Sequence, residues 1–292
     1  MDLPVPQRSL VPQKPLGRRA KGWLIAALCL LVIAMMLLPL VLSLLASLRP
    51  LAETSMVPPS YLPSSLSFDN YAKVANYQQG IWIYLRNSVV VAGLSIAMCL
   101  ALAVPAGFAL ARFAVPGKEV LFLIILASMM VPYQALLVPM FLMFSKLGLT
   151  ASYPGLAILH TVLQLPFSVY LMRNSFEAVP KELEEAARVD GASTAFQLRR
   201  VFIPLALPGM VTVGLFAFIT SWNEFIGALI LMNTERAFTV PIMLTGVVSG
   251  DFGSVDWGAL QASVVVSILP CLVVYLALQK YYVSGLLSGA VK

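Results

Sequence analysis

Residues 180–208 read PKELEEAARVDGASTAFQLRRVFIPLALP, a charged segment in a chain that is otherwise largely apolar. Ten ionisable side chains lie between Arg173 and Arg200, so this part of the chain must be in water. Pro180 suits the first position of a helix, and three glutamates follow it at the positive end of the helix dipole. Gly191 is a good C-terminal stop, so this helix is expected to be short.

A second short helix is expected next. Thr194, followed three residues later by Gln197, has the spacing of a capping box that starts a helix. Pro204 lacks a backbone donor and interrupts that helix, and a new apolar run follows it. The segment is therefore predicted to form two short helices with a sharp bend between them.

One face of the first helix is small and weakly apolar. Leu183, Ala186 and Ala187 share this face at the i, i+3, i+4 spacing, and charged residues surround it. Small side chains permit close approach by a partner surface. On charge content alone, a solvated loop helix with ordinary salt bridges is the alternative.

The order of residues in this segment resembles the signature loop of the integral membrane subunits of ABC importers. That pattern is an EAA triplet, a glycine six residues after the glutamate, and an Ile-x-Leu-Pro ending. Here the ending is Val-Phe-Ile-Pro at residues 201–204, which departs conservatively at two positions. The resemblance implies that the loop is the coupling helix that seats in an ATPase subunit, through Glu185, Ala186, Ala187, Asp190, Gly191 and Ala192.

The resemblance covers most of the chain, from about Phe68 to Lys292. Its most specific blocks are the loop and SWNEF at 221–225. The segment PSYLPSSLSFDNYAKV at 59–74, with Asn87-Ser88 after it, resembles the maltose-type, carbohydrate-importing branch of the family. The tail at 283–292 also resembles that branch, and either a second ATPase contact or a frayed terminus fits it.

Composition agrees with a polytopic membrane protein. The chain has 60% hydrophobic residues, 11% charged residues and a mean hydropathy of +0.89, whereas soluble domains carry about 25% charge. The net charge of +6 does not indicate a nucleic-acid partner, because the distribution of the basic residues matters more than their sum. Each cysteine lies in an apolar run, which favours buried thiols over disulfides or metal ligands, at Cys29, Cys99 and Cys271.

Six stretches are long enough to cross a bilayer, which takes roughly 20 apolar residues. The first is longer than a signal-peptide core, so it is expected to be retained. The fifth is broken only by Glu224. The stretches are residues 22–48, 87–111, 120–145, 147–172, about 208–232, and 257–279.

Basic residues set the orientation, because Lys and Arg prefer the cytoplasmic side. With the amino terminus inside, 14 of the 19 basic residues are cytoplasmic, and so are both termini and the loop that contains Glu185. We therefore expect an all-α membrane protein with six transmembrane helices of the ABC importer type I permease architecture. A basic cytoplasmic tail at 1–21 would precede the permease domain at 22–292, whose coupling loop spans 173–207.

The chain contains no recognisable nucleotide site. The only Gly-Lys dipeptide is Gly117-Lys118, and it fails the P-loop pattern because Arg112 and Glu119 replace a required glycine and a required Ser or Thr. ATP and Mg are therefore expected to bind a partner ATPase, and we expect no cofactor in this chain. There is also no HExxH, GxSxG or convincing Cys/His pair, so a membrane-embedded enzyme is disfavoured.

Polar residues within the spans are candidates for the translocation path. Glu224 lies 16 residues after Pro208, or about 24 Å along a helix, in the outer third of the bilayer. Asn223 and Glu224 line the path or its outer gate, or they form a structural pair near the interface. His160 and Gln164 lie one turn apart and either hydrogen-bond a sugar or are satisfied by neighbours.

The functional prediction is a permease subunit of an ATP-driven carbohydrate importer that works by alternating access. The resemblance implies a second, usually unlike, permease subunit, two copies of an ATPase and an extracytoplasmic solute-binding protein, with membrane lipid around the spans. The sugar stays open, from monosaccharide to uronate polymer or glycerol phosphate. The alternative is an ion-gradient-driven secondary transporter or channel, although the chain shows no internal symmetry and one carboxylate within a span.

Overall fold

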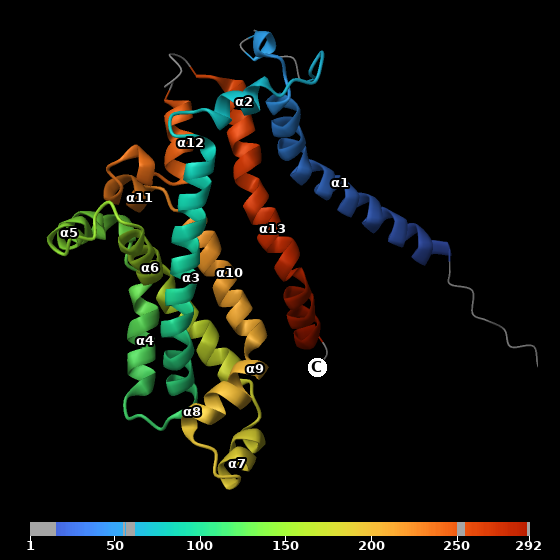
Figure 1. Ribbon diagram of the computed structural model, residues 1–292. Helices are drawn as coiled ribbons and strands as arrows, with labels where there is room; N and C mark the ends of the chain where they lie inside the picture. Colours follow the sequence, from blue (N-terminus) through green and yellow to red (C-terminus); the bar gives the residue numbers. More distant parts are fainter. Residues whose placement is uncertain (1–15, 55, 57–61, 250–254, 291–292) are drawn as a thin grey trace, which may run out of the picture.

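The computed structural model describes residues 16–54, 56, 62–249 and 255–290, with only the backbone described at 16–20 and 281–290. Every regular element in these ranges is a helix. Figure 1 shows a bundle of long helices with α2 (Asp69–Ala75) at one end and α7 (Lys181–Val189) at the other. We call these the α2 end and the α7 end. The predicted all-α class is confirmed.

The centre of the bundle consists of α3 (Ile81–Arg112), α6 (Tyr153–Glu177) and α10 (Leu207–Asn223). Helices α3 and α6 approach so closely that a Cβ atom at Gly107 would lie 2.6 Å from the Cβ of Met172. Small residues allow such contacts between apolar helices, because the backbones themselves then pack.

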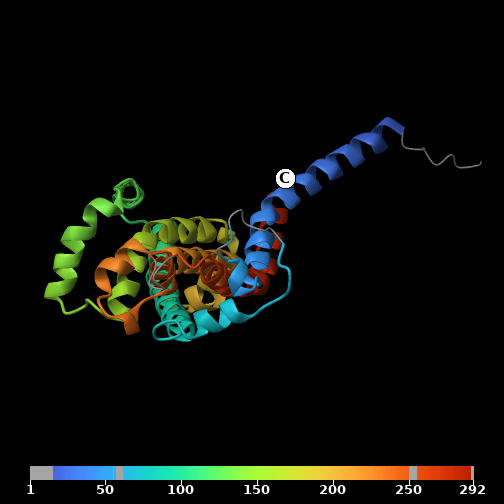
Figure 2. The ribbon, with the colours of Figure 1, turned by 90° about the horizontal axis from the view of Figure 1, so that it is seen from above.

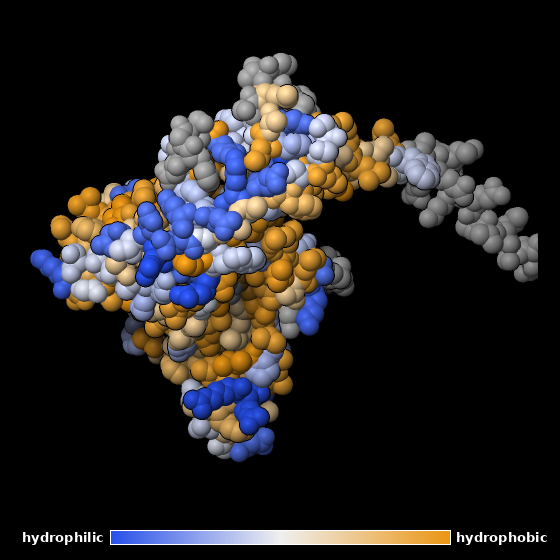
Figure 3. Space-filling view, turned by 45° about the horizontal axis from the view of Figure 1, so that its top comes forward, coloured by the Kyte–Doolittle hydropathy of each residue, from blue (hydrophilic) through white to orange (hydrophobic). Residues whose placement is uncertain are grey.

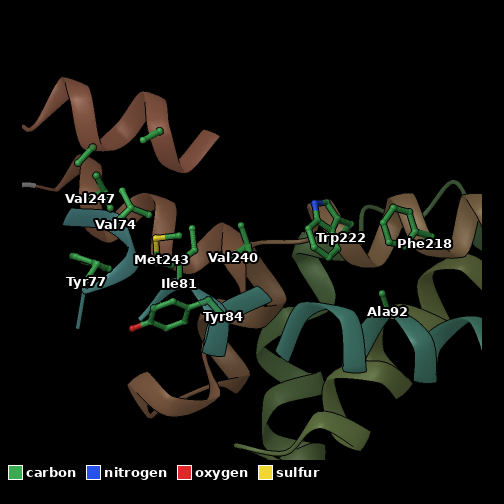
Figure 4. Close-up of a cluster of buried hydrophobic side chains, with 12 residues drawn as sticks. Val74, Tyr77, Ile81, Tyr84, Ala92, Phe218, Trp222, Val240, Met243 and Val247 are labelled. Atoms are coloured by element: carbon green, nitrogen blue, oxygen red, sulfur yellow. The ribbon is translucent and has the colours of Figure 1, made fainter. Parts of the chain in front are cut away.

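Two aromatic clusters fill the core. Near the α7 end, the ring of Phe108 meets those of Phe176 and Phe202 edge to face, at 5.6 and 4.9 Å between centroids. Toward the α2 end, Phe218 and Trp222 stack at 5.4 Å on α10, and Figure 4 shows them beside Ala92 of α3. Helices α12 (Val240–Val248) and α13 (Trp257–Ala290) complete this second cluster.

The surface is apolar around the bundle and polar at its ends. Figure 3 shows hydrophobic residues along the sides, with hydrophilic residues gathered at the α7 end and across the α2 end. Helix α1 (Leu16–Ser47) projects from the bundle, and Figure 2 shows it on the side away from α4 and α5. Its apolar residues are exposed nearly throughout, so they require an apolar environment outside this chain.

Four helical segments are long and apolar enough to cross a membrane, or up to six if each bent pair counts as one span. The single segments are Lys21–Ser47, Ile81–Arg112, Tyr153–Glu177 and Trp257–Lys280. One bent pair is α4 (Lys118–Ser128) with α5 (Tyr133–Lys146), at 95°, and the other is Thr194–Leu205 with α10, at 77°.

The stretch 120–145, expected to be one span, is broken between Ser128 and Tyr133. Pro132 lacks a backbone donor and restricts the preceding residue, which favours a break there. Helix α4 has 11 residues, about 16 Å, and cannot cross a hydrocarbon core of about 30 Å by itself.

The expected stretch 208–232 is also interrupted. Helix α10 ends at Asn223, Glu224 has extended backbone angles, and α11 (Ile226–Leu231) follows. Between α11 and α12 lies the short turn η3 (Glu235–Ala237).

Other boundaries shift by several residues. Helix α3 begins at Ile81, six residues before the expected stretch 87–111, so Arg86 is helical. The residues between the first two expected stretches also contain η1 (Leu51–Glu53) and α2. Helix α1 begins at Leu16, within the expected tail, whose residues 1–15 lie outside the described part.

The cysteines are free thiols, but their burial differs. Cys99 is buried, Cys271 is half-buried and Cys29 is exposed on α1. The prediction of burial is wrong for Cys29, because α1 leaves the bundle and an apolar residue on it faces outward.

Candidate functional site

The segment that opens the sequence forms a helix, a turn and a second helix at the α7 end. Helix α7 follows Pro180, which is its N-cap and not, as expected, its first helical residue. Gly191 has φ of +76°, the left-handed conformation that glycine adopts without strain. The N–H of Ala192 donates to the carbonyl of Ala187 at 2.9 Å and that of Gly191 to Arg188 at 3.1 Å, which is a Schellman motif.

The second helix runs through three short elements, α8 (Thr194–Gln197), the π-helical turn η2 (Leu198–Phe202) and α9 (Ile203–Leu205). The cap of α8 is Ser193, whose hydroxyl accepts from the N–H of Phe196, so the expected capping role of Thr194 is wrong by one residue. The side chain of Gln197 reaches back to the carbonyl of Ala192 at 2.8 Å and fixes the turn between the helices.

The predicted coupling residues gather on this exposed hairpin. Glu185, Ala186, Asp190 and Gly191 are exposed, while Ala187 and Ala192 are half-buried. Three large apolar side chains near them are also exposed, those of Leu183, Val189 and Phe196. Of these, the sequence analysis identified only Leu183. Val189 is 88% exposed and Phe196 is 54% exposed. An apolar surface of this kind on a polar loop indicates a contact with another molecule.

A buried arginine holds the hairpin to the bundle. Arg112, at the end of α3, donates to the carbonyls of Phe176 and Val179 and lies 3.5 Å from Glu184 on α7. A second arginine, Arg173, pairs with Glu119 of α4 and with Glu177 of its own helix. These contacts tie α3, α4, α6 and α7 together at the α7 end.

The second candidate site is the break between α10 and α11. The carboxylate of Glu224 accepts the N–H groups of Gly227 at 2.7 Å and Ala228 at 2.9 Å, at the start of α11. It also accepts the hydroxyl of Tyr133 at 2.8 Å, and the Nε2 of His160 lies 3.2 Å away. A buried carboxylate is costly unless it is hydrogen-bonded, and these contacts satisfy it.

A cavity of about 850 Å³ opens beside this break. Its walls come from the α4–α5 bend, α6 and the α10–α11 break, and they include Ser128, Pro132, Tyr133, Val162, Pro166, Thr220, Asn223, Glu224 and Phe225. The volume is in the range of small-molecule sites, and its few polar groups stand among apolar ones.

The structure brings the predicted path residues to one region, but only some of them reach the cavity wall. Asn223 and Glu224 line the cavity, whereas His160 and Gln164 do not. His160 is buried and its Nδ1 lies 2.8 Å from the hydroxyl of Ser221. Gln164 accepts the hydroxyl of Thr220 at 2.8 Å, and its Nε2 has no hydrogen-bond partner among the described residues.

Sequence reasoning missed Tyr133 and Thr220 as members of this site. Tyr133 follows Pro132, whose missing N–H favours a break, but nothing in the sequence shows that α5 turns toward Glu224. Within the part of the chain that the structure describes, no group of three His, Cys, Asp or Glu side chains could hold a metal ion.

Comparison with known proteins agrees with this geometry. The profile of the family described as "Binding-protein-dependent transport system inner membrane component" matches residues 103–287. The probable ABC transporter permease protein YurM of Bacillus subtilis is 34% identical, over 99% of this chain and 95% of the relative. The trehalose transport system permease protein SugB of Mycobacterium tuberculosis is 34% identical, over 94% of this chain and 99% of the relative.

A solved structure has the same architecture. A chain of a bacterial ABC transporter that imports the acidic polysaccharide alginate superposes with a TM-score of 0.80 at 27% identity, covering 93% of this chain and 100% of the other. The resemblance noted in the sequence is therefore confirmed. The chain belongs to the family of binding-protein-dependent transport system inner membrane components, and its relatives are ABC transporter permeases.

Proposed function

We propose that this chain is the permease subunit of an ATP-driven importer that moves a carbohydrate across the cytoplasmic membrane, coupled to a separate ATPase through α7. The observation that carries the proposal is the exposed hairpin of α7, Gly191 and α8 at the end of an apolar bundle. Family membership supports the importer class. The relative named for trehalose and the structure named for alginate support a carbohydrate substrate.

The hairpin has the chemistry of a docking element. Glu185 is exposed and forms no ion pair within the described chain, next to the small side chains of Ala186 and Ala187. Val189 and Phe196 add apolar area that a cleft in the ATPase would cover. Asp190, Gly191 and Ala192 form the turn that sets the angle of the second helix.

The α7 end is cytoplasmic in this proposal, and each bent helix pair forms one of six spans. The excess of Lys and Arg at that end supports the orientation. Residues 1–21 then form a cytoplasmic tail, and the carboxyl end is cytoplasmic too. The permease domain comprises residues 22–292 and includes the coupling loop at 173–207. The residues at 283–292 remain a candidate second contact, but their side chains lie outside the described part.

The translocation path includes the cavity beside the α10–α11 break. Asn223 and Glu224 face it and are placed to meet a solute, together with Tyr133 and Thr220. His160 and Gln164 support them from behind, through Glu224 and Thr220. Because the α4–α5 bend and the α10–α11 break meet here, a change at either one alters the cavity, which alternating access requires.

The remaining parts of the importer are other molecules. ATP and Mg bind the ATPase dimer, because no P-loop occurs in this chain. A second permease subunit, usually unlike this one, completes the pore and accounts for the exposed apolar surface of the bundle. A solute-binding protein delivers the substrate at the α2 end.

The test is uptake by the complete complex. The chain is reconstituted in proteoliposomes with a sister permease, an ATPase and a solute-binding protein from the same organism, and labelled trehalose, maltose and oligosaccharides are supplied. We expect uptake that requires ATP and the binding protein and survives ionophores. Uptake by the chain alone, driven by an ion gradient, would contradict the proposal and favour a secondary transporter.

A further inference from the structure

One guanidinium at the α7 end contacts three helical elements, α6, α7 and η2, and the linker between α6 and α7. Arg112 is the last residue of α3, and one of its terminal nitrogens donates to the carbonyls of Phe176 and Val179, both at 2.5 Å. The other lies 3.5 Å from a carboxylate oxygen of Glu184 on α7. The guanidinium carbon lies 4.8 Å from the centre of the Phe202 ring in η2.

Helix α7 has little other hold on the bundle. None of its residues is buried, so no hydrophobic core fixes it. The chain connects it to α6 through residues 178–180, but its contact with α3 joins residues 72 positions apart. Among the described residues, the ion pairs of α7 are that of Glu184 with Arg112 and that of Glu184 with Arg188 in the same helix.

The contact is shielded from water on both sides. The side chains of Arg112 and Glu184 are 5% and 16% exposed. Separating a shielded pair leaves a charge uncompensated, so the two groups resist moving apart. Arg112 is also held by carbonyls at the C-terminal end of α6, where the helix dipole favours a cation.

We propose that Arg112 is the positioning residue that transmits displacement of α7 to α3. The inference rests on the proposed ATPase coupling through α7. When the ATPase moves α7, Glu184 carries Arg112 with it, and α3 follows as a lever of 32 residues that reaches the α2 end. Since α3 packs on α6 and α10, the displacement reaches the helices that line the cavity.

The experiment compares coupling in the complete reconstituted complex. Arg112→Gln and Glu184→Gln each remove one charge of the ion pair, while Arg112→Lys keeps a cation that cannot hold all three oxygens at once. Glu177→Gln is the matched control, because it removes one partner of Arg173 at the same end and leaves the pair with Glu119. The readouts are sugar imported per ATP hydrolysed and retention of the ATPase on the purified permeases.

We expect the ratio of sugar to ATP to fall about tenfold in Arg112→Gln and Glu184→Gln, which is about 1.4 kcal/mol of coupling free energy. Hydrolysis and ATPase retention should persist in both. Arg112→Lys should keep an intermediate ratio, and Glu177→Gln that of the wild type. Since Arg112→Gln removes buried hydrogen bonds and can impair folding, Glu184→Gln decides the outcome.

Three results would overturn the inference. The first is an unchanged ratio of sugar imported to ATP hydrolysed in an assembled Glu184→Gln complex. The second is an equal loss of coupling in Glu177→Gln. The third is loss of ATPase retention in Glu184→Gln, which would assign the carboxylate to docking. In each case the wild-type complex still imports sugar with ATP, so the proposed function stands. A wild-type complex without ATP-driven uptake would refute both.

Discussion

The hydroxyl of Tyr133 donates a 2.8 Å hydrogen bond to the carboxylate of Glu224, and this bond joins two breaks in otherwise apolar helices. Tyr133 is the first residue after the 95° bend between α4 and α5, and Glu224 is the first after α10. The cavity lies where these breaks meet. The hydroxyl of Tyr133 at one break and the carboxylate of Glu224 at the other therefore satisfy each other.

Replacement of this carboxylate should impair transport without loss of the complex. In Glu224→Gln, one acceptor oxygen becomes an amide donor, so one of the two N–H groups at the start of α11 loses its acceptor. We expect uptake at saturating sugar to fall about tenfold or more, since a buried polar group left unpaired costs about 1–3 kcal/mol. Uptake assays and pull-down of the partner subunits measure the two effects.

The matched variant Tyr133→Phe removes one of the hydrogen bonds and leaves the rest. Its effect should be smaller, about 1 kcal/mol, and should largely disappear in the Glu224→Gln background. Additive effects of the two changes, or unchanged uptake kinetics in Glu224→Gln, would show that the network has no part in transport.

Charge reversal on α7 should separate ATP hydrolysis from transport. Glu185→Lys places a cation at the exposed face next to Ala186, so we expect weaker ATPase retention and loss of sugar-stimulated hydrolysis, with normal membrane insertion. Glu235→Lys, the same change in the exposed turn before α12, is the control. Wild-type stimulated hydrolysis in the reconstituted Glu185→Lys complex would contradict a coupling role.

Two glycines of α3 should respond to alanine in opposite ways. At Gly107 a Cβ atom would lie 2.8 Å from the backbone nitrogen of Arg173, so Gly107→Ala must separate α3 from α6, at a cost of about 1–3 kcal/mol. At Gly93 no atom lies within 4 Å. Gly93→Ala should stabilise the protein by about 0.5–1 kcal/mol. Thermal unfolding in detergent distinguishes them, and equal shifts would argue against this packing.

Acid should loosen the contact between α2 and α13. Burial by itself raises the pKa of Asp256, but N–H groups at the start of α13 and the ammonium of Lys73 outweigh it and hold the pKa below 3.8. Because the pKa is lower in the folded state, the stabilisation is present above the unfolded pKa and is lost as pH falls through the folded one.

Asp256→Asn should therefore lower the unfolding temperature at pH 7, and its difference from the wild type should shrink below about pH 4. Lys73→Met removes the ammonium alone and should have a smaller effect, because the backbone donors to Asp256 remain. A difference that stays constant from pH 7 to pH 3 would show that ionisation of Asp256 is irrelevant to stability.

Local chemistry explains why the α7 hairpin could be predicted. Three local features define the hairpin: a left-handed glycine, a run of glutamates, and alanines at helical spacing. Each depends on neighbours a few residues away, so the sequence predicts its effect, as at Gly191 and Ala187. The cap of α8 is Ser193 and not Thr194, because both residues offer a hydroxyl and the backbone conformation decides which one accepts the N–H at the start of the helix.

Hydrophobicity along the chain was enough to establish a helical membrane protein, because the energy of burying apolar residues in lipid depends on composition over about 20 residues. It could not reveal the pairing of Tyr133 with Glu224 or the reach of Arg112 to α7. Those features join residues far apart in the sequence, and a contact between them exists only once α3, α6 and α10 have packed.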